Sequence, residues 1–247
     1  MVGWRSLFTT GFLTVFMLGC GNFFNSTSKH SKQVVREISV SQVIKPTPTN
    51  QKAEDFFNQG NSLLNSHQYQ AAIVAYNRAI FLNPDIAEVW INRGNALTAL
   101  KLYPDALISY ERAIALNSQK NEAWYNRGNT LLITKDYQQA LTSYDQTLSL
   151  KPDKYEAWIN RGIALTKMQK YADALISYDK AIRIKPDKDL AYYNKACAYA
   201  LAGDADKAIA NLQTAIKLDP TKYIKLAKTD ADFHKVRHHK RFQELIN

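Results

Sequence analysis

The sequence predicts an all-α fold, a solenoid of five helix pairs followed by short capping helices. The first observation is a phrase that returns every 34 residues: WINRGNALT at 90–98, WYNRGNTLL at 124–132 and WINRGIALT at 158–166. The second is the spacing within it, because Trp, Gly and Leu at i, i+4 and i+7 share one face of a helix. A fixed period of this length is typical of stacked units, none of which buries its apolar face alone.

The composition fits a chain with a sizeable core. Apolar residues make up 46% of the sequence, which disfavours wholesale disorder. The net charge of +10 favours acidic partners, including an anionic membrane or nucleic acid. No nucleic-acid motif accompanies that charge, so we expect no nucleic-acid partner. The two cysteines, Cys20 and Cys197, exclude a disulfide framework and a CxxC metal site.

Residues 1–20 are predicted to be a signal peptide. One cation, Arg5, precedes an apolar run of the size of a signal-peptide core, which is too short for the roughly 20 residues of a membrane-spanning helix. The stretch MLGC at 17–20 resembles the lipobox of bacterial lipoproteins, although Met17 and Leu18 depart from its commoner residues. The resemblance implies a lipid on Cys20 and attachment to a membrane of the bacterial envelope. An ordinary secretory signal or an uncleaved anchor is the alternative.

Residues 21–52 are predicted to be a flexible tether. They are rich in Ser, Thr, Asn and Lys, contain Pro46 and Pro48, and lack a sustained helical period.

Residues 53–222 divide into five units of 34 residues without a gap: 53–86, 87–120, 121–154, 155–188 and 189–222. An aromatic residue stands at the fourth place of every unit, Gly or Ala at the eighth, and four units share a second-helix Tyr. The eighth-place residues are Gly60, Gly94, Gly128, Gly162 and Ala196, and the tyrosines are Tyr76, Tyr110, Tyr144 and Tyr178. Small residues on facing stripes let helices approach closely while aromatic side chains fill the gaps. Pro84, Pro152, Pro186 and Pro220 end four units.

These positions resemble the tetratricopeptide repeat (TPR) family over 170 of the 247 residues. The resemblance implies a right-handed α-solenoid of five helix pairs. Departures are few, with Ser118, Thr147, Ala205 and Leu212 replacing a proline, an alanine and two tyrosines. Residues 223–247 leave the period but keep helical spacing. We expect them to form a helical cap, with Tyr223, Leu226 and Ala227 packing in one helix and Phe242, Leu245 and Ile246 in another.

The resemblance also implies a concave groove lined by the first helices. If the fourth, eighth and eleventh places face the interior, the second, fifth, sixth and ninth face the groove. The predicted partner-binding residues are Asn92, Asn95, Tyr125, Asn126, Asn129, Ile159, Asn160, Tyr193 and Asn194. A row of amides beside apolar side chains can hydrogen-bond an extended peptide. The alternative is that the amides only solvate the groove and cap the local backbone.

Charged rows narrow the choice of partner. Glu54, Glu88, Glu122 and Glu156 at the second place would repel a bound C-terminal carboxylate, which argues against the chaperone-tail binders of the family. Arg93, Arg127 and Arg161 recur at the seventh place. We expect their stems to pack on aromatic neighbours with the heads in water, and a row that reads phosphate or carboxylate is the alternative.

No residue set predicts catalysis, a metal site or a cofactor. Cys197 lies among small apolar residues without a neighbouring His, which is typical of a core or groove hydrophobe. His234 and His238 have i, i+4 spacing beside His239, but no third ligand accompanies them. The predicted function is therefore a monomeric, non-enzymatic scaffold tethered to a bacterial membrane. We expect it to bind an extended or helical segment of another protein in the concave groove, with the assembly of a membrane complex as the role that the resemblance suggests. An enzyme's regulatory subunit and a self-assembling structural solenoid are the alternatives.

Overall fold

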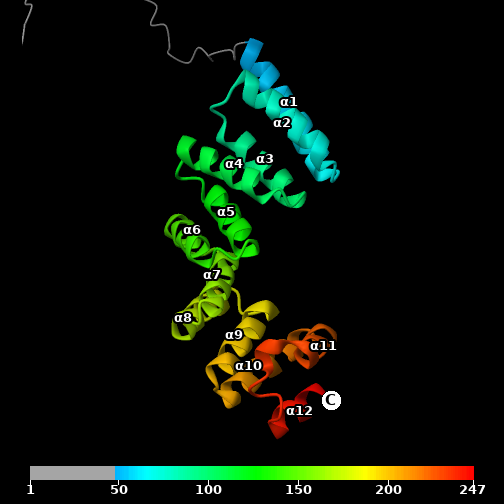
Figure 1. Ribbon diagram of the computed structural model, residues 1–247, viewed down its shortest axis with the longest axis vertical. Helices are drawn as coiled ribbons and strands as arrows, with labels where there is room; N and C mark the ends of the chain where they lie inside the picture. The colour runs from blue at the N-terminus through cyan, green and yellow to red at the C-terminus, as the bar shows by residue number, and fades with distance from the viewer. Residues whose placement is uncertain (1–47) are drawn as a thin grey trace, which may run out of the picture. The chain divides into compact units, whose positions relative to one another are not determined.

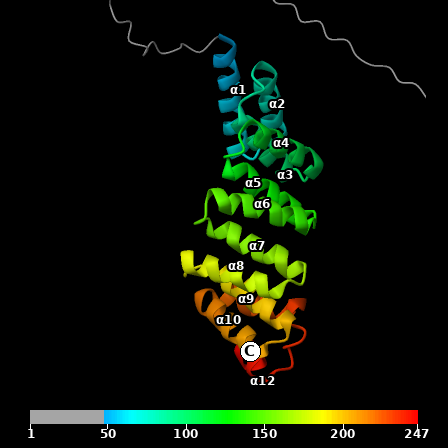
Figure 2. The ribbon, with the colours of Figure 1, turned by 90° about the vertical axis from the view of Figure 1, so that its left-hand side faces the viewer.

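Helical hairpins follow one another along residues 48–247, the part of the chain that this computed structural model describes (Figures 1 and 2). The five pairs are α1 (Pro48–Asn65) with α2 (Tyr69–Leu82), α3 (Ala87–Ala99) with α4 (Tyr103–Leu116), α5 (Asn121–Ile133) with α6 (Tyr137–Leu150), α7 (Tyr155–Lys167) with α8 (Tyr171–Ile184), and α9 (Asp189–Ala202) with α10 (Ala205–Leu218). Each second helix packs on the next first helix, and first helices touch their neighbours. The predicted α-solenoid of five helix pairs is confirmed, and these residues contain no strand.

The turn inside each pair depends on one residue with positive φ. His67, Lys101, Lys135 and Gln169 adopt φ of 58–65°, and Gly203 in the last pair has φ 90°. In the second pair, the N–H of Leu102 bonds to the carbonyl of Leu97 at 2.9 Å, which is the helix-ending bond of a Schellman motif. Four of these five turns therefore place a non-glycine residue in the left-handed conformation, which is sterically unfavourable for residues with a side chain.

In each of the first four pairs, a glycine of the first helix packs against a tyrosine ring of the second helix. Tyr76, Tyr110, Tyr144 and Tyr178 are at most 1% exposed. A Cβ added at Gly162 would lie 2.5 Å from Cε1 of Tyr178, and the three earlier glycines face their tyrosines at 2.4–2.8 Å. The eighth place is therefore glycine because the ring occupies the space of a methyl group. In the fifth pair Ala196 fits, since Leu212 replaces the tyrosine there.

Two boundaries differ from the sequence prediction. Helix α1 begins at Pro48, so residues 48–52, assigned to the tether, are helical, because Pro is well suited to the first turn. Pro220 does not end the fifth unit but starts α11 (Pro220–Thr229), with Asp219 as its N-cap. Residues 1–47, with Cys20 and the predicted signal peptide and most of the tether, lie outside the described residues. None of the described helices is both long and apolar enough to cross a bilayer.

The first helix pair carries polar residues where inner pairs carry packed ones. Asp55, Gln59 and Ser62 at the third, seventh and tenth places are exposed. In the later pairs the third place holds a buried Val or Ala, and the tenth place holds a buried Ala or Thr. The seventh place holds an Arg or Lys whose side chain is hydrogen-bonded to other side chains. A further helix pair would have to bury these polar groups, which is unfavourable. The sequence of α1 is therefore that of an N-terminal cap.

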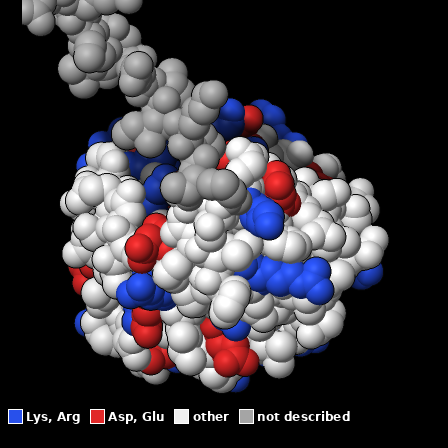
Figure 3. Space-filling view, turned by 90° about the horizontal axis from the view of Figure 1, so that it is seen from above, with Lys and Arg blue, Asp and Glu red and all other residues white. Residues whose placement is uncertain are grey.

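The C-terminal cap consists of α11, a 3₁₀ turn η1 (Ala231–Phe233) and α12 (Lys240–Ile246). Tyr223, Phe233 and Phe242 are fully buried against α9 and α10. Of the predicted packing residues, Tyr223, Ala227 and Phe242 are buried and Leu245 and Ile246 are half-buried, but Leu226 is 40% exposed because it lies on the outer side of α11. At the other end of the molecule, viewed from above, lysine and arginine side chains are interspersed with aspartate and glutamate on the visible surface (Figure 3).

Candidate partner-binding groove

The candidate site is a pocket of about 290 Å³ formed by successive first helices. Its lining comes from α5, α7, the start of α9 and α11, namely Tyr125, Tyr155, Glu156, Ile159, Asn160, Lys188, Asp189, Leu190 and Lys222. Tyrosine rings and aliphatic side chains form its walls, and two carboxylates, two ammonium groups and an amide carry its polar groups. The structure thus brings three predicted residues together in one cavity, Tyr125, Ile159 and Asn160.

The predicted asparagine row is a ladder that links successive units. Nδ2 of the sixth-place Asn donates to Oδ1 of the ninth-place Asn one unit earlier, at 2.9 Å from Asn160 to Asn129. The Tyr144 hydroxyl donates to the same Oδ1 at 2.9 Å. The pairs Asn92–Asn61 and Asn126–Asn95 repeat this pattern at 2.8 and 2.9 Å. The ninth-place amides therefore fix one unit against the next, a role that neither sequence interpretation included.

The ladder stops at the fourth unit because Ile163 stands at its ninth place. Asn194 has no side-chain amide partner there and donates to the carbonyl of Leu190 on its own helix, at 2.8 Å. Asn160 uses its N–H groups on Asn129 and, at 3.3 Å, on the Tyr125 hydroxyl. Within residues 48–247 no side chain donates to its Oδ1, which can therefore accept a hydrogen bond from a partner.

The fifth-place side chains, predicted to face the groove, are mostly buried, although Tyr125 and Ile159 line the pocket. Ile91, Ile159 and Tyr193 are at most 6% exposed, and only Phe57 and Tyr125 are half-buried. Each inner first helix contacts its own second helix, the preceding second helix and neighbouring first helices, so a wide arc of its surface is covered. The eighth place is buried in all five units, and the eleventh is buried in the second, third and fourth units. Leu63, Tyr199 and the fourth-place tryptophans are half-buried. The Trp158 indole N–H donates to the carbonyl of Pro152 at 2.8 Å.

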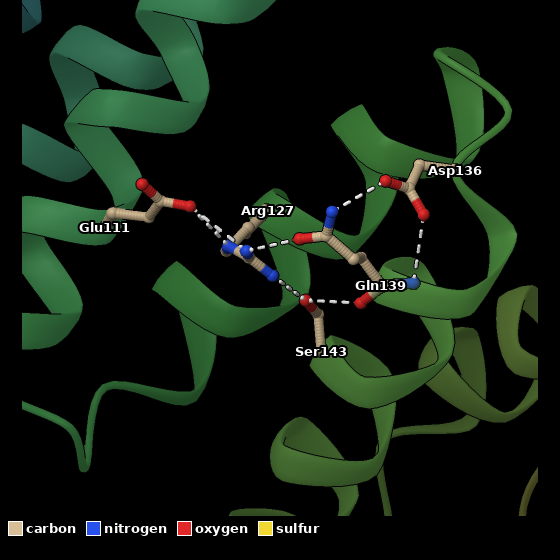
Figure 4. A network of polar contacts seen from close by, with 5 residues as sticks. All are labelled: Glu111, Arg127, Asp136, Gln139 and Ser143. Carbon is tan, nitrogen blue, oxygen red and sulfur yellow. Dashed lines mark hydrogen bonds and ion pairs between the residues drawn. The ribbon is translucent and has the colours of Figure 1, made fainter.

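The arginine row is a second set of links between units, on the side of the second helices, and Figure 4 shows the contacts of its middle member, Arg127. Nη1 of Arg127 donates to the buried Ser143 hydroxyl at 2.8 Å, and Nη2 contacts Glu111 of the preceding unit at 3.0 Å and Gln139 at 3.0 Å. The Arg127 side chain is only 14% exposed. Arg93 and Arg161 make corresponding contacts.

The prediction that these arginine heads lie in water is therefore wrong, since buried hydroxyls and acceptors of the preceding unit bind them. The sequence contains a signal for this arrangement, because Ser109, Ser143 and Ser177 recur at the same spacing as the arginines.

The cap covers the groove face of the fifth unit. The Tyr193 hydroxyl donates to Asp230 at 2.7 Å, and its ring meets Phe233 edge-on at 5.8 Å. The Lys167 ammonium lies 3.5 Å from the Asp232 carboxylate. Tyr193, predicted to contact a partner, is thus buried by the protein's own C-terminal segment. The pocket lined by α5, α7 and the start of α9 lies next to this covered surface and remains open.

The thiol and imidazole candidates for chemistry can be placed directly. Cys197 is buried below Asp230, and burial together with the two carboxylates raises the pKa of its thiol far above the ordinary value. Such a thiol is protonated and a poor nucleophile. Cys197, Asp230 and Asp232 form the one possible metal-ligand cluster among the described residues, and it contains no histidine. A ring nitrogen of His234 hydrogen-bonds to the carbonyl of Ala231. His234, His238 and His239 do not belong to a metal-ligand cluster within residues 48–247.

The stacked helix pairs define an α-helical repeat protein, and comparison of the sequence with family models identifies the repeat. Tetratricopeptide repeat models match residues 57–121, 122–154, 155–188 and 190–222. The chain therefore belongs to the tetratricopeptide repeat family, as its sequence predicted.

Solved structures share the fold at low sequence identity. MamA is 23% identical with a TM-score of 0.65, over 73% of this chain and 96% of that one. YrrB, described as a TPR protein with an unusual peptide-binding site, is 21% identical with a TM-score of 0.64, over 74% of this chain and 98% of that one. A tetratricopeptide repeat protein from Parabacteroides merdae is 20% identical with a TM-score of 0.68, over 75% and 73%. No curated protein sequence matches the chain.

Proposed function

We propose that this protein is a non-catalytic scaffold that binds an extended segment of another protein along its open groove. The observation that carries the proposal is the pocket between α5, α7 and α9, whose volume of about 290 Å³ suits one large apolar side chain. Leu190, 41% exposed at its rim, offers further apolar surface. Asn160 Oδ1 beside it can accept a backbone N–H. A preformed groove lowers the ordering cost of binding, as in peptide recognition by other rigid scaffolds.

The same proposal places the protein at a bacterial membrane. A lipid on Cys20 would attach it to the cell envelope, with the residues before α1 as the tether, and secretion or an uncleaved N-terminal anchor is the alternative. Replacement of Cys20 by Ala should move the protein from the membrane to the soluble fraction of its host. Retention of Cys20→Ala in the membrane would contradict lipidation and favour an uncleaved anchor.

Binding as a monomer is favoured over self-assembly into longer solenoids. The end surface of the first unit is polar, because it carries Asp55, Gln59 and Ser62. The C-terminal cap covers the end surface of the fifth unit, so neither end offers an apolar surface on which another copy could stack. Sedimentation of the protein over a wide concentration range should give one constant mass, whereas a growing series of oligomers would support the structural alternative. A role as the regulatory subunit of an enzyme would appear as an enzyme among the bound partners.

A matched pair of variants tests the groove. Leu190→Asp places a charge at the pocket, and Ile176→Asp places the same charge on the second-helix surface, where Ile176 is 57% exposed. Because both side chains are exposed, both variants should keep the wild-type circular dichroism and melting temperature. Partners cross-linked to the full-length protein in cells should be lost with Leu190→Asp and kept with Ile176→Asp. Equal recovery with both variants would refute binding at this pocket.

A further inference from the structure

The second-place glutamate of the fourth unit differs from its counterpart in the second unit. Glu88 forms an ion pair with Lys120, the lysine that precedes the next first helix. Glu156 and Lys188 occupy the corresponding places. Within the described part of the chain, no cationic nitrogen lies within 4 Å of the Glu156 carboxylate. Glu156 therefore faces the pocket without a cationic partner.

The reason is a tyrosine at the first place of the fourth unit. The Lys188 ammonium lies over the ring of Tyr155, 5.6 Å from its centroid, where the second unit has Ala87. Lys154 does the same with Tyr125, at 4.3 Å, where the second unit has Ile91. A tyrosine face attracts an ammonium ion and so competes with the carboxylate for it. The tyrosines that wall the pocket thus keep both lysines from the glutamates.

The other charges that line the pocket are already paired. Asp189 accepts from the Lys222 ammonium and from the Tyr223 hydroxyl, each at 2.9 Å. Glu156 is half-buried, and no lysine or arginine of the described residues forms an ion pair with it. Burial raises the pKa of both Tyr125 and Tyr155, and the Glu156 carboxylate raises them further. Among the residues that line the pocket, Glu156 is therefore the carboxylate that forms no ion pair with a lysine or arginine.

We propose that the segment bound in this pocket presents a lysine or arginine side chain to Glu156, next to the apolar side chain that fills the cavity. This inference rests on the proposed function. The aliphatic stem of the basic side chain packs against Tyr155 and Leu190, and its charged head reaches the half-buried carboxylate. A carboxylate on the partner would meet Glu156 at short range, which is unfavourable.

Selection from a random peptide display library on the immobilised full-length protein tests the proposal. We expect enriched peptides to carry Lys or Arg within two residues of an aromatic or large aliphatic residue. A synthetic copy of an enriched peptide should bind Glu156→Gln at least ten-fold more weakly than wild type, by fluorescence anisotropy. Glu122→Gln, the same change at the same place one unit earlier and outside the pocket lining, should bind like wild type. Replacing the peptide's Arg by citrulline, or its Lys by norleucine, should reproduce the loss.

Two outcomes separate this inference from the proposed function. If enriched peptides need Leu190 but bind Glu156→Gln unchanged, or if acidic residues are enriched, the basic side chain is refuted and the groove proposal stands. If no selected peptide distinguishes Leu190→Asp from Ile176→Asp, the groove proposal fails and this inference fails with it.

Discussion

Replacing Gly162 by Ala tests whether close contact or helix propensity controls the core of each unit. Gly162 lies inside α7, where Ala is favoured by about 1 kcal/mol on propensity alone. The added Cβ would lie 2.5, 2.7 and 2.8 Å from Cε1, Cζ and Cδ1 of Tyr178. The ring is 1% exposed and its hydroxyl is held 3.1 Å from Thr166 Oγ1, so it has little room to move. Overpacking of this kind costs about 1–3 kcal/mol.

The overpacking cost less the propensity gain leaves an expected loss of up to about 2 kcal/mol of unfolding free energy, which corresponds to a melting temperature lower by up to about 4–8 °C. Urea unfolding followed by circular dichroism measures the change. The slope with urea has to be compared as well, because repeat arrays need not unfold in two states.

The fifth unit supplies the control for this prediction. There Ala196 and Leu212 occupy the places of Gly162 and Tyr178, and both are fully buried. Tyr178→Leu should therefore remove most of the clash, so that the double variant loses at least about 1 kcal/mol less than the sum of the single variants. A Gly162→Ala protein that is more stable than wild type, or strictly additive losses, would refute the steric argument.

Three further predictions concern the polar links between units. Arg127→Ala should lower stability by about 2 kcal/mol in urea unfolding, because the buried Ser143 hydroxyl loses a charged donor; an unchanged midpoint would contradict this role. Asn129→Ala removes the acceptor of two hydrogen bonds and should cost about 1–3 kcal/mol, whereas Asn194→Ala, outside the ladder, should cost less than about 0.5 kcal/mol; equal losses would refute the ladder. Burial raises the pKa of Tyr110 to about 12. The unfolded chain releases this proton near pH 10, so stability should fall by about 2–3 kcal/mol between pH 10 and pH 12. Tyr110→Phe should remove that part of the decline, and an identical pH profile would contradict the assignment.

The periodic sequence was sufficient to predict the repeated core. Gly162 and Tyr178 recur at one spacing because every unit meets nearly the same neighbours, so their burial follows from the pattern. The turns were less visible. Lys101 and Gln169 adopt positive φ although neither is a glycine, and only the helix packing on both sides imposes that conformation.

The sequence by itself determined the number and order of the helix pairs, because helical periodicity depends on residues a few positions apart. Only the tertiary structure decided how polar groups pair across units. Asn129 bonds to a residue 31 positions later, and Tyr155 attracts Lys188 away from Glu156. Which acceptor or ring a polar group contacts depends on which of them lies within a few ångströms in the folded protein. Spacing along the chain does not give that distance.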